Sequence, residues 1–264
     1  MDIFKRDLAP ISDQAWQEIN SRAETVINSQ LTSRKSLKVL GPFGLSYTSV
    51  PTGRLDILEN TTSNVKLGLY QHLSLLETRI SFSLSKWELD NILRGTKDVD
   101  LSALEKAAKE LALFEDDVIY NGHPLAKIVG LTHACKHKVT IALDSEAILT
   151  ALSKGLVSLK KSFVEPPFNF IVGEALFDAL NHLHGSRRLK AIIEEMIGGE
   201  VIFSEVVEGG LLIPVKHVDL EFTVGQEYTI GYESHDNELV TLFIMNSFTM
   251  RVLDENILLR VLVK

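Results

Sequence analysis

Three side chains that could bind a metal ion alternate in the heptapeptide THACKHK. On a β-strand, His133, Cys135 and His137 would project from one face, where they could meet a metal together. Zinc sites of the usual kind combine C-x₂-C or H-x₃-H pairs with a second pair elsewhere in the chain. The sequence has no second pair, and Lys136 and Lys138 would repel a cation. The segment is therefore predicted to be a solvated strand or loop that holds no metal.

The consecutive acids Glu115, Asp116 and Asp117 are a second candidate, because paired carboxylates can act as general acid and base. They lie near the end of a predicted helix, where consecutive residues fan out around the axis and do not converge. Negative charges at a helix C-terminus also oppose the helix dipole. We expect basic residues of a neighbouring subunit to compensate them, which predicts a structural or interface role.

Signatures of nucleophilic and nucleotide chemistry are missing from the sequence. It has no G-x-S-x-G nucleophile elbow, and Cys135, the only cysteine, has no helix N-terminus beside it that would activate the thiol. The glycine pairs Gly198–Gly199 and Gly209–Gly210 are not followed by the Gly-Lys-Ser/Thr of a phosphate-binding loop. A soluble hydrolase is thus the least favoured function, and no catalytic residue is predicted.

A short basic segment, HLHGSRR, joins two predicted helices and carries His182, His184, Arg187 and Arg188. Its simplest interpretation is a solvated turn. In a symmetric assembly, however, copies of this loop would surround one axis, and a ring of charges selects ions by their sign. The sequence alone leaves both interpretations open.

The composition is that of a globular protein without features for binding nucleic acid or membrane. Of the 264 residues, 45% are apolar and 23% are charged, and 35 acidic against 27 basic residues give a formal net charge of −8. An acidic protein lacks the basic face that phosphate binding needs. A single cysteine allows no internal disulfide, and no secretory signal or membrane-spanning stretch is visible. We expect a soluble, cytoplasmic protein.

Helices and strands are predicted to alternate without a regular rhythm, which indicates an α+β fold. Ser12 is the expected N-cap of the first helix, and two later helices open with the spacing of capping boxes, at Ser85 and Glu88 and at Ser102 and Glu105. The other predicted helices cover residues 144–161, 175–183 and 188–197, and the first covers 12–30.

Two β-hairpins are predicted at opposite ends of the chain. Residues 48–75 form an arm around the polar segment LENTTSNVK, and such an arm needs a neighbour in its own chain or in another subunit. Residues 225–252, GQEYTIGYESHDNELVTLFIMNSFTMRV, alternate apolar and polar residues on both sides of a polar turn. This second stretch is predicted to be a long ribbon without chemistry of its own.

Five segments spread over nearly the whole chain resemble the encapsulin shell proteins, also called the linocin family. They are DLAPISDQAWQEI, SRKSLKVLGPFG, FSLSKWELDNILRG, ALFEDDVIYNG and the ribbon of residues 225–252. Short polar segments such as IGYE and WELDN are part of the match, and apolar periodicity would not produce them by chance. The sequence is most similar to family 1 of these proteins.

The resemblance implies the major capsid protein fold of tailed bacteriophages (Hong Kong 97 type). The implied parts are 1–47 for the N-terminal helix and the start of the peripheral domain, 48–75 for the extended loop, 76–130 for the peripheral domain with its spine helix, 131–216 for the axial domain and 217–264 for the C-terminal strands of the peripheral domain. Family members assemble into icosahedral shells around enzymes that carry a C-terminal targeting peptide. Typical cargo is a dye-decolorising peroxidase or a ferritin-like protein, which links the family to oxidative stress and iron storage.

Matching segments place the family's cargo-peptide groove at Ile27, Leu31, Arg34 and Ile230, although simple helix packing would equally explain Ile27 and Leu31. An apolar stripe with one arginine suits an extended peptide of alternating apolar residues with an acidic or carbonyl contact. Lys38 stands where some members carry an acid, so the charge preference of the peptide stays open.

The resemblance also implies a pore and a cofactor position. The fivefold pore would be lined by His184, Gly185, Ser186, Arg187 and Arg188. Trp87 matches a position associated with flavin in some shells, but Arg187 replaces the accompanying aromatic residue, and an interface role explains Trp87 better. No cofactor is required. The family's axial-loop proline is missing at Arg188, which leaves the pore width open.

A viral or prophage major capsid protein of the same fold is the second hypothesis. It would need a portal, a maturation protease and DNA packaging. The chain lacks the long N-terminal scaffolding segment of many phage capsid proteins, which favours the shell protein.

Overall fold

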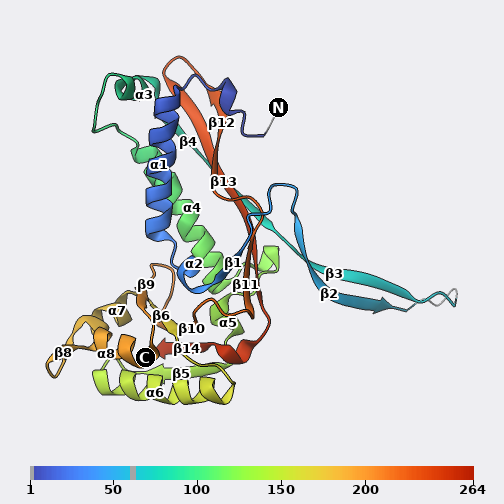
Figure 1. Cartoon of the computed structure of the whole chain (residues 1–264), viewed down its shortest axis with the longest axis vertical. Helices are drawn as coiled ribbons and strands as arrows, with labels where there is room; N and C mark the ends of the chain where they lie inside the picture. The colour runs from blue at the N-terminus through green and yellow to red at the C-terminus, as the bar shows by residue number, and fades with distance from the viewer. Residues whose placement is uncertain (1–2, 60–63) are drawn as a thin grey trace.

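Two β-sheets, each packed against helices, and a projecting hairpin make up the molecule (Figure 1). The computed structural model describes residues 3–59 and 64–264. The helices, with short 3-10 turns marked η, are η1 (Arg6–Leu8), α1 (Asp13–Gln30), α2 (Ser33–Ser36), α3 (Lys86–Leu93), α4 (Ser102–Asn121), η2 (Pro124–Ala126), α5 (Leu131–Ala134), α6 (Ser145–Lys161), α7 (Glu174–Asn181), α8 (Leu189–Ile197) and η3 (Glu255–Ile257). The strands are β1 (Lys38–Leu40), β2 (Ser49–Leu58), β3 (Leu67–Ser74), β4 (Leu76–Ser85), β5 (His137–Ile141), β6 (Phe168–Val172), β7 (Leu183–His184), β8 (Arg187–Arg188), β9 (Val201–Phe203), β10 (Gly210–Pro214), β11 (Leu220–Val224), β12 (Thr229–His235), β13 (Leu239–Val252) and β14 (Leu259–Val263).

The first sheet is built around β13, the longest strand. Its order is β1-β11-β13-β12, and β4 pairs with the other side of β13. The pairings are antiparallel except that of β1 with β11. Helix α4 packs on β4, and α1 packs on α4, so the apolar stripes of both helices share one core with the strands. The ribbon predicted at residues 225–252 is confirmed as the β12–β13 hairpin.

The second sheet has the order β5-β14-β10-β6-β9, and α6 and α8 pack against it. Its core continues into the first sheet through Phe222 and Phe248, whose rings lie 5.7 Å apart. Strand β14 comes from the C-terminus and pairs with β5 and β10. The expected assignment of all of 217–264 to the peripheral domain must therefore be corrected: Leu259–Val263 completes the sheet formed by residues of 131–216.

The helix ends show which local predictions hold. Ser12 caps α1 as predicted, because its side-chain oxygen accepts a hydrogen bond from Ala15 N–H at 3.3 Å. The two predicted capping boxes are wrong, since neither Ser85 nor Ser102 forms a side-chain cap. Asp100 takes that role before α4, where its carboxylate accepts from Ser102 N–H at 3.0 Å. Ser102 already lies in the first helical turn, one position too late to cap it.

The predicted arm at residues 48–75 is the β2–β3 hairpin, which projects away from both sheets (Figure 1). Residues 60–63 of its predicted polar turn lie outside the described residues. Within the described part of the arm, large apolar side chains are exposed: Leu55, Ile57, Leu58, Val65, Leu67, Leu69 and Tyr70.

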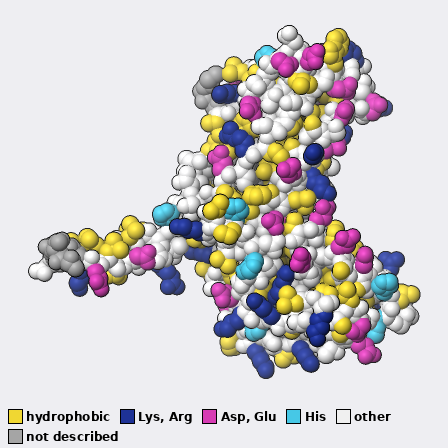
Figure 2. Space-filling view, turned by 180° about the vertical axis from the view of Figure 1, so that it is seen from behind, with side chains coloured by type: hydrophobic (Ala, Val, Ile, Leu, Met, Phe, Trp, Pro, Cys, Tyr) yellow, Lys and Arg dark blue, Asp and Glu magenta, His cyan; other side chains and the backbone are white. Residues whose placement is uncertain are grey.

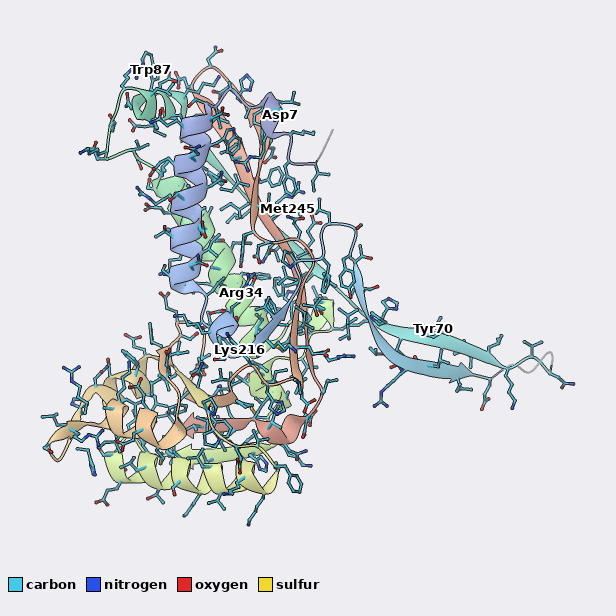
Figure 3. All side chains as sticks on the ribbon, viewed as in Figure 1. Asp7, Arg34, Tyr70, Trp87, Lys216 and Met245 are labelled. Atoms are coloured by element: carbon cyan, nitrogen blue, oxygen red, sulfur yellow. The ribbon has the colours of Figure 1, made fainter. Side chains whose placement is uncertain are left out.

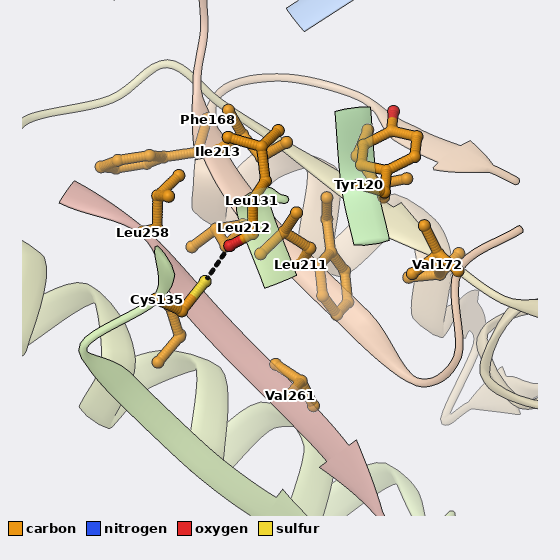
Figure 4. Packing of buried hydrophobic residues seen from close by; sticks show 14 of the residues in the cluster. Tyr120, Leu131, Cys135, Phe168, Val172, Leu211, Leu212, Ile213, Leu258 and Val261 are labelled. Atoms are coloured by element: carbon orange, nitrogen blue, oxygen red, sulfur yellow. Dashed lines mark hydrogen bonds between the residues drawn. The ribbon is translucent and has the colours of Figure 1, made fainter. Parts of the chain in front are cut away.

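The heptapeptide THACKHK does not form one strand. His133 lies in α5, Cys135 follows that helix, and His137 begins β5, so the three side chains do not share a face. Cys135 is buried, its thiol donates to Leu131 O at 3.0 Å, and burial raises the pKa of the thiol to about 12 (Figure 4). The prediction of a solvated strand or loop holds only in part: Lys136, His137 and Lys138 are exposed or half-buried where β5 begins, but Cys135 is buried and the alternation spans a junction between helix and strand. In residues 3–59 and 64–264, no three His, Cys, Asp or Glu side chains are grouped to hold a metal ion.

Candidate functional site: a groove between α1 and β12

A hollow of about 450 Å³ lies between α1 and β12. The four residues predicted for peptide binding all line it: Ile27 and Leu31 from α1, Arg34 from α2 and Ile230 from β12. The other lining residues are Arg6, Asn20, Ala23, Glu24, Asn28, Glu227, Tyr228, Thr229 and Ile244. The fold thus brings the four predicted residues together, while their binding of a peptide stays a prediction.

Helical spacing explains the apolar wall of the groove. Ala23, Ile27 and Leu31 follow one another at steps of four, so they lie in one column along α1. Their exposed fractions are only 4–5%, and Ile230 opposite them is equally buried. The same side chains therefore pack in the core of the first sheet and form the wall of the hollow. Glu24, one residue further round the helix, is exposed at the rim.

Arg34 is held from two sides by carboxylates. Its Nε and Nη2 donate to the two oxygens of Glu115 at 2.7 and 2.8 Å, and its Nη1 donates to both oxygens of Glu227 at 2.8 and 3.0 Å. The guanidinium group also lies over the rings of Phe222 and Tyr228, 5.4 and 5.1 Å from their centroids. Arg34 is thus a fixed cation at the end of the groove, with its charge already compensated.

Glu115 is fully buried and accepts hydrogen bonds from three residues. Besides Arg34, Tyr228 Oη donates to it at 2.9 Å and Asn246 Nδ2 donates at 2.7 Å. Burial raises the pKa of Glu115, and the hydrogen bonds and charge of Arg34 oppose that rise. For Arg34, burial acts to lower the pKa, but bonding to Glu115 and the charge of Glu227 outweigh it and the pKa is raised. The pair is a buried ion pair with its remaining lone pairs satisfied.

Asp116 holds the start of α2. Its carboxylate accepts from Thr32 N–H at 2.8 Å, from Thr32 Oγ1 at 2.6 Å and from Ser33 N–H at 3.1 Å. Burial raises its pKa against these hydrogen bonds. Asp117 instead accepts from Asn121 Nδ2 at 2.7 Å on the exposed side of α4. The expectation that a neighbouring subunit compensates these acids is therefore wrong for Glu115 and Asp116, whose partners belong to their own chain.

Sequence reasoning missed Glu227, Tyr228 and Asn246 as parts of this site. Glu227 lies 193 residues after Arg34, and Asn246 lies 131 residues after Glu115. No local spacing connects residues so far apart, because β12 and β13 bring them to α2 and α4 only when the sheet forms. Their placement in the ribbon was the one available signal.

The predicted pore residues form a separate small hairpin, far from the groove (Figure 1). In this β7–β8 hairpin His184 pairs with Arg187, and Gly185 turns the chain with a φ of 64°. Arg187 Nη2 donates to Glu195 at 2.8 Å, with both side chains more than half exposed. The structure places Ser186 at the tip and Arg188 at the start of α8, and whether this hairpin surrounds a pore stays a prediction.

Trp87 lies at the far end of the first sheet from Arg34 (Figure 3). The residue is 68% exposed, and the Arg94 guanidinium carbon lies 5.6 Å from the centroid of its ring. One exposed ring with a cation over it does not enclose a planar cofactor within one subunit, and flavin binding at Trp87 stays a prediction. The interface role of Trp87 also stays a prediction.

Comparison with known proteins identifies the family. The family model described as an encapsulating protein for peroxidase matches residues 1–249. The chain belongs to the encapsulin family of shell proteins. A type 1 encapsulin shell protein of Rhodococcus erythropolis is 30% identical over 252 residues, which cover 94% of this chain and 95% of that protein. A type 1 encapsulin shell protein of Rhodospirillum rubrum is also 30% identical, over 262 residues, covering 96% of this chain and 94% of that protein.

Solved structures show the fold of this encapsulin. It is similar to the virus-like particle of Pyrococcus furiosus with a TM-score of 0.66 and 18% identity, over 92% of this chain and 97% of that one. The predicted fold is confirmed: an α+β capsid protein of the Hong Kong 97 type. In the described part of the chain, no helix combines the length with the apolar character that crossing a membrane requires.

Proposed function

We propose that this encapsulin is the protomer of an icosahedral nanocompartment in the cytoplasm, which encloses a cargo enzyme and has no catalytic activity of its own. The cargo would be held by a C-terminal targeting peptide in the groove between α1 and β12. One observation carries this proposal: Ile27, Leu31, Arg34 and Ile230, matched to the peptide groove by sequence, line a single hollow.

The chemistry of the groove suits an extended peptide with alternating apolar side chains. The wall of Ile27, Leu31 and Ile230 lets such side chains leave water, which contributes roughly 25 cal/mol per Å² of apolar surface. Two carboxylates, Glu24 and Glu227, and two guanidinium groups, Arg6 and Arg34, line the hollow, and Arg34 is already bonded to Glu115 and Glu227. Because the charge of Arg34 is compensated within the chain, a neutral amide or carbonyl of the peptide suits the polar end of the groove better than an acidic group.

The cargo we propose first is a dye-decolorising peroxidase, because the matched family is described as an encapsulating protein for peroxidase. A ferritin-like protein is the alternative implied by the sequence resemblance. The β7–β8 hairpin would line the pore through which ions or small molecules reach either enzyme, with Arg187 and Arg188 in each copy.

Assembly would use the β2–β3 arm. Figure 2 shows apolar side chains along the arm, away from the body of the molecule. Ile57 and Tyr70 are each 76% exposed in the isolated chain, although large apolar side chains are normally buried. A neighbouring subunit that receives the arm would cover them.

The test is to produce the chain together with a fluorescent protein that carries the C-terminal tail of the candidate peroxidase. We expect hollow particles of megadalton mass, seen by native mass spectrometry and negative-stain microscopy, that retain the fluorescent protein. Leu31→Ser should empty the particles without dissolving them, whereas Leu31→Met, which conserves volume, should keep them loaded. A monodisperse monomer or dimer would contradict the proposal.

A phage capsid protein is the second candidate, because the fold is shared with a chain from the capsid of Myoviridae phage XM1 at a TM-score of 0.57 and 11% identity, over 86% of this chain and 89% of that one. Nuclease-resistant DNA inside the purified particles would favour that function. Particles that hold protein and no DNA would favour the encapsulin function.

A further inference from the structure

Strand β12 forms an edge of the first sheet. It pairs with β13 on one side, and its other side faces the groove below α1. The outward N–H and C=O groups of an edge strand can pair with an added strand unless something covers them.

The hydrogen bonds of β13 determine which residues of β12 point outward. Ser247 N–H donates to Gln226 O at 2.9 Å, so Ser247 faces the β12 side, as do the residues two and four positions before it. Ile244 has the opposite orientation and bonds toward β4. Because Ile244 is paired with Ile230, these two residues form a non-hydrogen-bonded pair of the antiparallel ladder. The N–H and C=O of Ile230 therefore point away from β13.

The other end of β12 confirms this orientation independently. Tyr232, two residues after Ile230, donates its N–H to Phe4 O at 2.7 Å, outside the sheet. Tyr228, two residues before Ile230, donates its N–H to the Glu227 side chain at 3.0 Å. The outward amides on both sides of Ile230 are thus satisfied. Within the described residues, the outward amide and carbonyl of Ile230 have no such partner.

The N-terminal segment shows that an outward amide of this edge donates to a backbone carbonyl from outside the sheet. Phe4 pairs with Tyr232 through its carbonyl, and its ring stacks on Phe243 with 6.4 Å between centroids. Gly231 leaves room for the Phe243 ring, since a Cβ at that position would clash with it. The chain itself therefore covers the far end of the edge and leaves open the part that lies in the groove.

We propose that the targeting peptide docks as an added β-strand on the edge of β12, with its backbone hydrogen-bonded to the N–H and C=O of Ile230. This inference rests on the proposed function and specifies how the peptide binds. Every second peptide side chain would then point toward Ile27 and Leu31 under α1, and the others would point away. Backbone pairing provides affinity without regard to sequence, and the alternate apolar side chains provide specificity.

The first test compares two substitutions of one residue in the complete shell. Ile230→Pro removes the outward N–H without removing a hydrogen bond to β13, a position where edge strands tolerate proline. Ile230→Val keeps the N–H and removes one methylene group. Losing one backbone hydrogen bond should lower the retention of a fluorescent protein that carries the peroxidase tail by about fivefold or more. Ile230→Val should lower the retention of the same fluorescent protein clearly less.

If Ile230→Pro and Ile230→Val shells lose the tagged fluorescent protein to the same extent, the peptide does not bind as an added strand. Binding of the peptide in the groove would still stand. If wild-type shells retain no tagged protein, the proposed function fails first, and this inference fails with it. The two failures are therefore distinguishable.

A second test does not depend on the assembly of the proline variant. A synthetic peptide with the peroxidase tail sequence is N-methylated at one position at a time, and its binding to wild-type shells is measured by fluorescence anisotropy. Strand addition predicts that N-methylation abolishes binding at the one peptide position whose N–H donates to Ile230 C=O, and that it is tolerated at the adjacent positions, whose N–H groups point away from β12. Uniform tolerance, or equal loss at adjacent positions, would contradict the proposal.

Discussion

The β12–β13 ribbon and the β2–β3 arm are both antiparallel hairpins rich in apolar residues, but only the ribbon is enclosed by its own chain. Strand β13 has β4 on one side and β11 and β12 on the other, and nearly all its residues from Val240 to Met250 are buried. The arm has only its own two strands, and its residues are almost all exposed or half-exposed.

The register of the arm shows what it lacks. Leu55 pairs with Tyr70, so the two side chains share one face, and Leu58 pairs with Leu67 on the opposite face. Apolar side chains therefore stand on both faces, whereas a hairpin that lies on its own core would be polar on one. An isolated two-stranded hairpin is marginally stable in water. The arm is thus complete only when a second molecule covers it, while the ribbon is complete within one subunit.

Substitution in the β2–β3 arm should give the largest effect, which is the loss of particle assembly. Replacing Ile57 and Tyr70 by Asp removes two side chains whose burial would contribute on the order of 1.5–3 kcal/mol each at every subunit contact. We expect native mass spectrometry to show free subunits in place of megadalton particles, with helical and strand content retained by circular dichroism. Arg54→Gln, in the same strand, is the matched control and should assemble normally. Intact particles from the double variant would show that the arm needs no partner.

The stability of the β12–β13 ribbon should depend on the buried ion pair between Arg34 and Glu115. Arg34→Ala leaves Glu115 buried without its cation, so we expect a loss of about 3–5 kcal/mol in the free energy of unfolding measured in urea. Arg22→Ala removes the exposed pair with Glu105 and should cost about 1 kcal/mol or less. Similar losses in the two variants would contradict a special role for the buried pair.

The same pair predicts an unusual pH dependence of the ribbon. Burial raises the pKa of Glu115 in the folded chain above its ordinary value of 4.5, so the folded chain binds this proton more tightly than the unfolded chain. Between those two pKa values, the contribution of Glu115 to stability increases as pH falls and is lost as pH rises. Glu115→Gln should flatten that part of the curve of urea midpoint against pH. Glu110→Gln, exposed on the same helix, should leave it unchanged.

The β7–β8 hairpin should give the smallest change in stability. Arg187 and Glu195 form an ion pair with side chains 55% and 68% exposed, and exposed pairs contribute about 0–1 kcal/mol. We expect Arg187→Gln to leave the melting temperature of the particle nearly unchanged. If the hairpin lines the proposed pore, the rate at which an anionic substrate reaches the enclosed enzyme should fall, because each copy of Arg187→Gln removes one cation from the opening. A large loss of stability would mean that the hairpin supports the shell and does not merely line an opening.

The sequence was sufficient for the elements whose signals are local. Helix α1 begins after Ser12 as predicted, and the ribbon of residues 225–252 follows from its alternation, because caps and periodicity act over a few residues. The capsid fold and the four groove residues came from the resemblance, and the structure brings those four residues together. Local spacing gave a wrong prediction for THACKHK. The two-residue period of a strand was assumed for the whole segment, but His133 lies in a helix and His137 in a strand.

The roles of the acids depended on contacts across the whole chain. Glu115, Asp116 and Asp117 are equivalent as a sequence pattern, but α4 turns them toward an arginine, a helix start and solvent respectively. The sequence determined where these carboxylates lie on a helix. Their partners, and the open backbone edge at Ile230, followed from packing α1 and α2 against distant strands, because burial and hydrogen bonding are satisfied only when those segments meet.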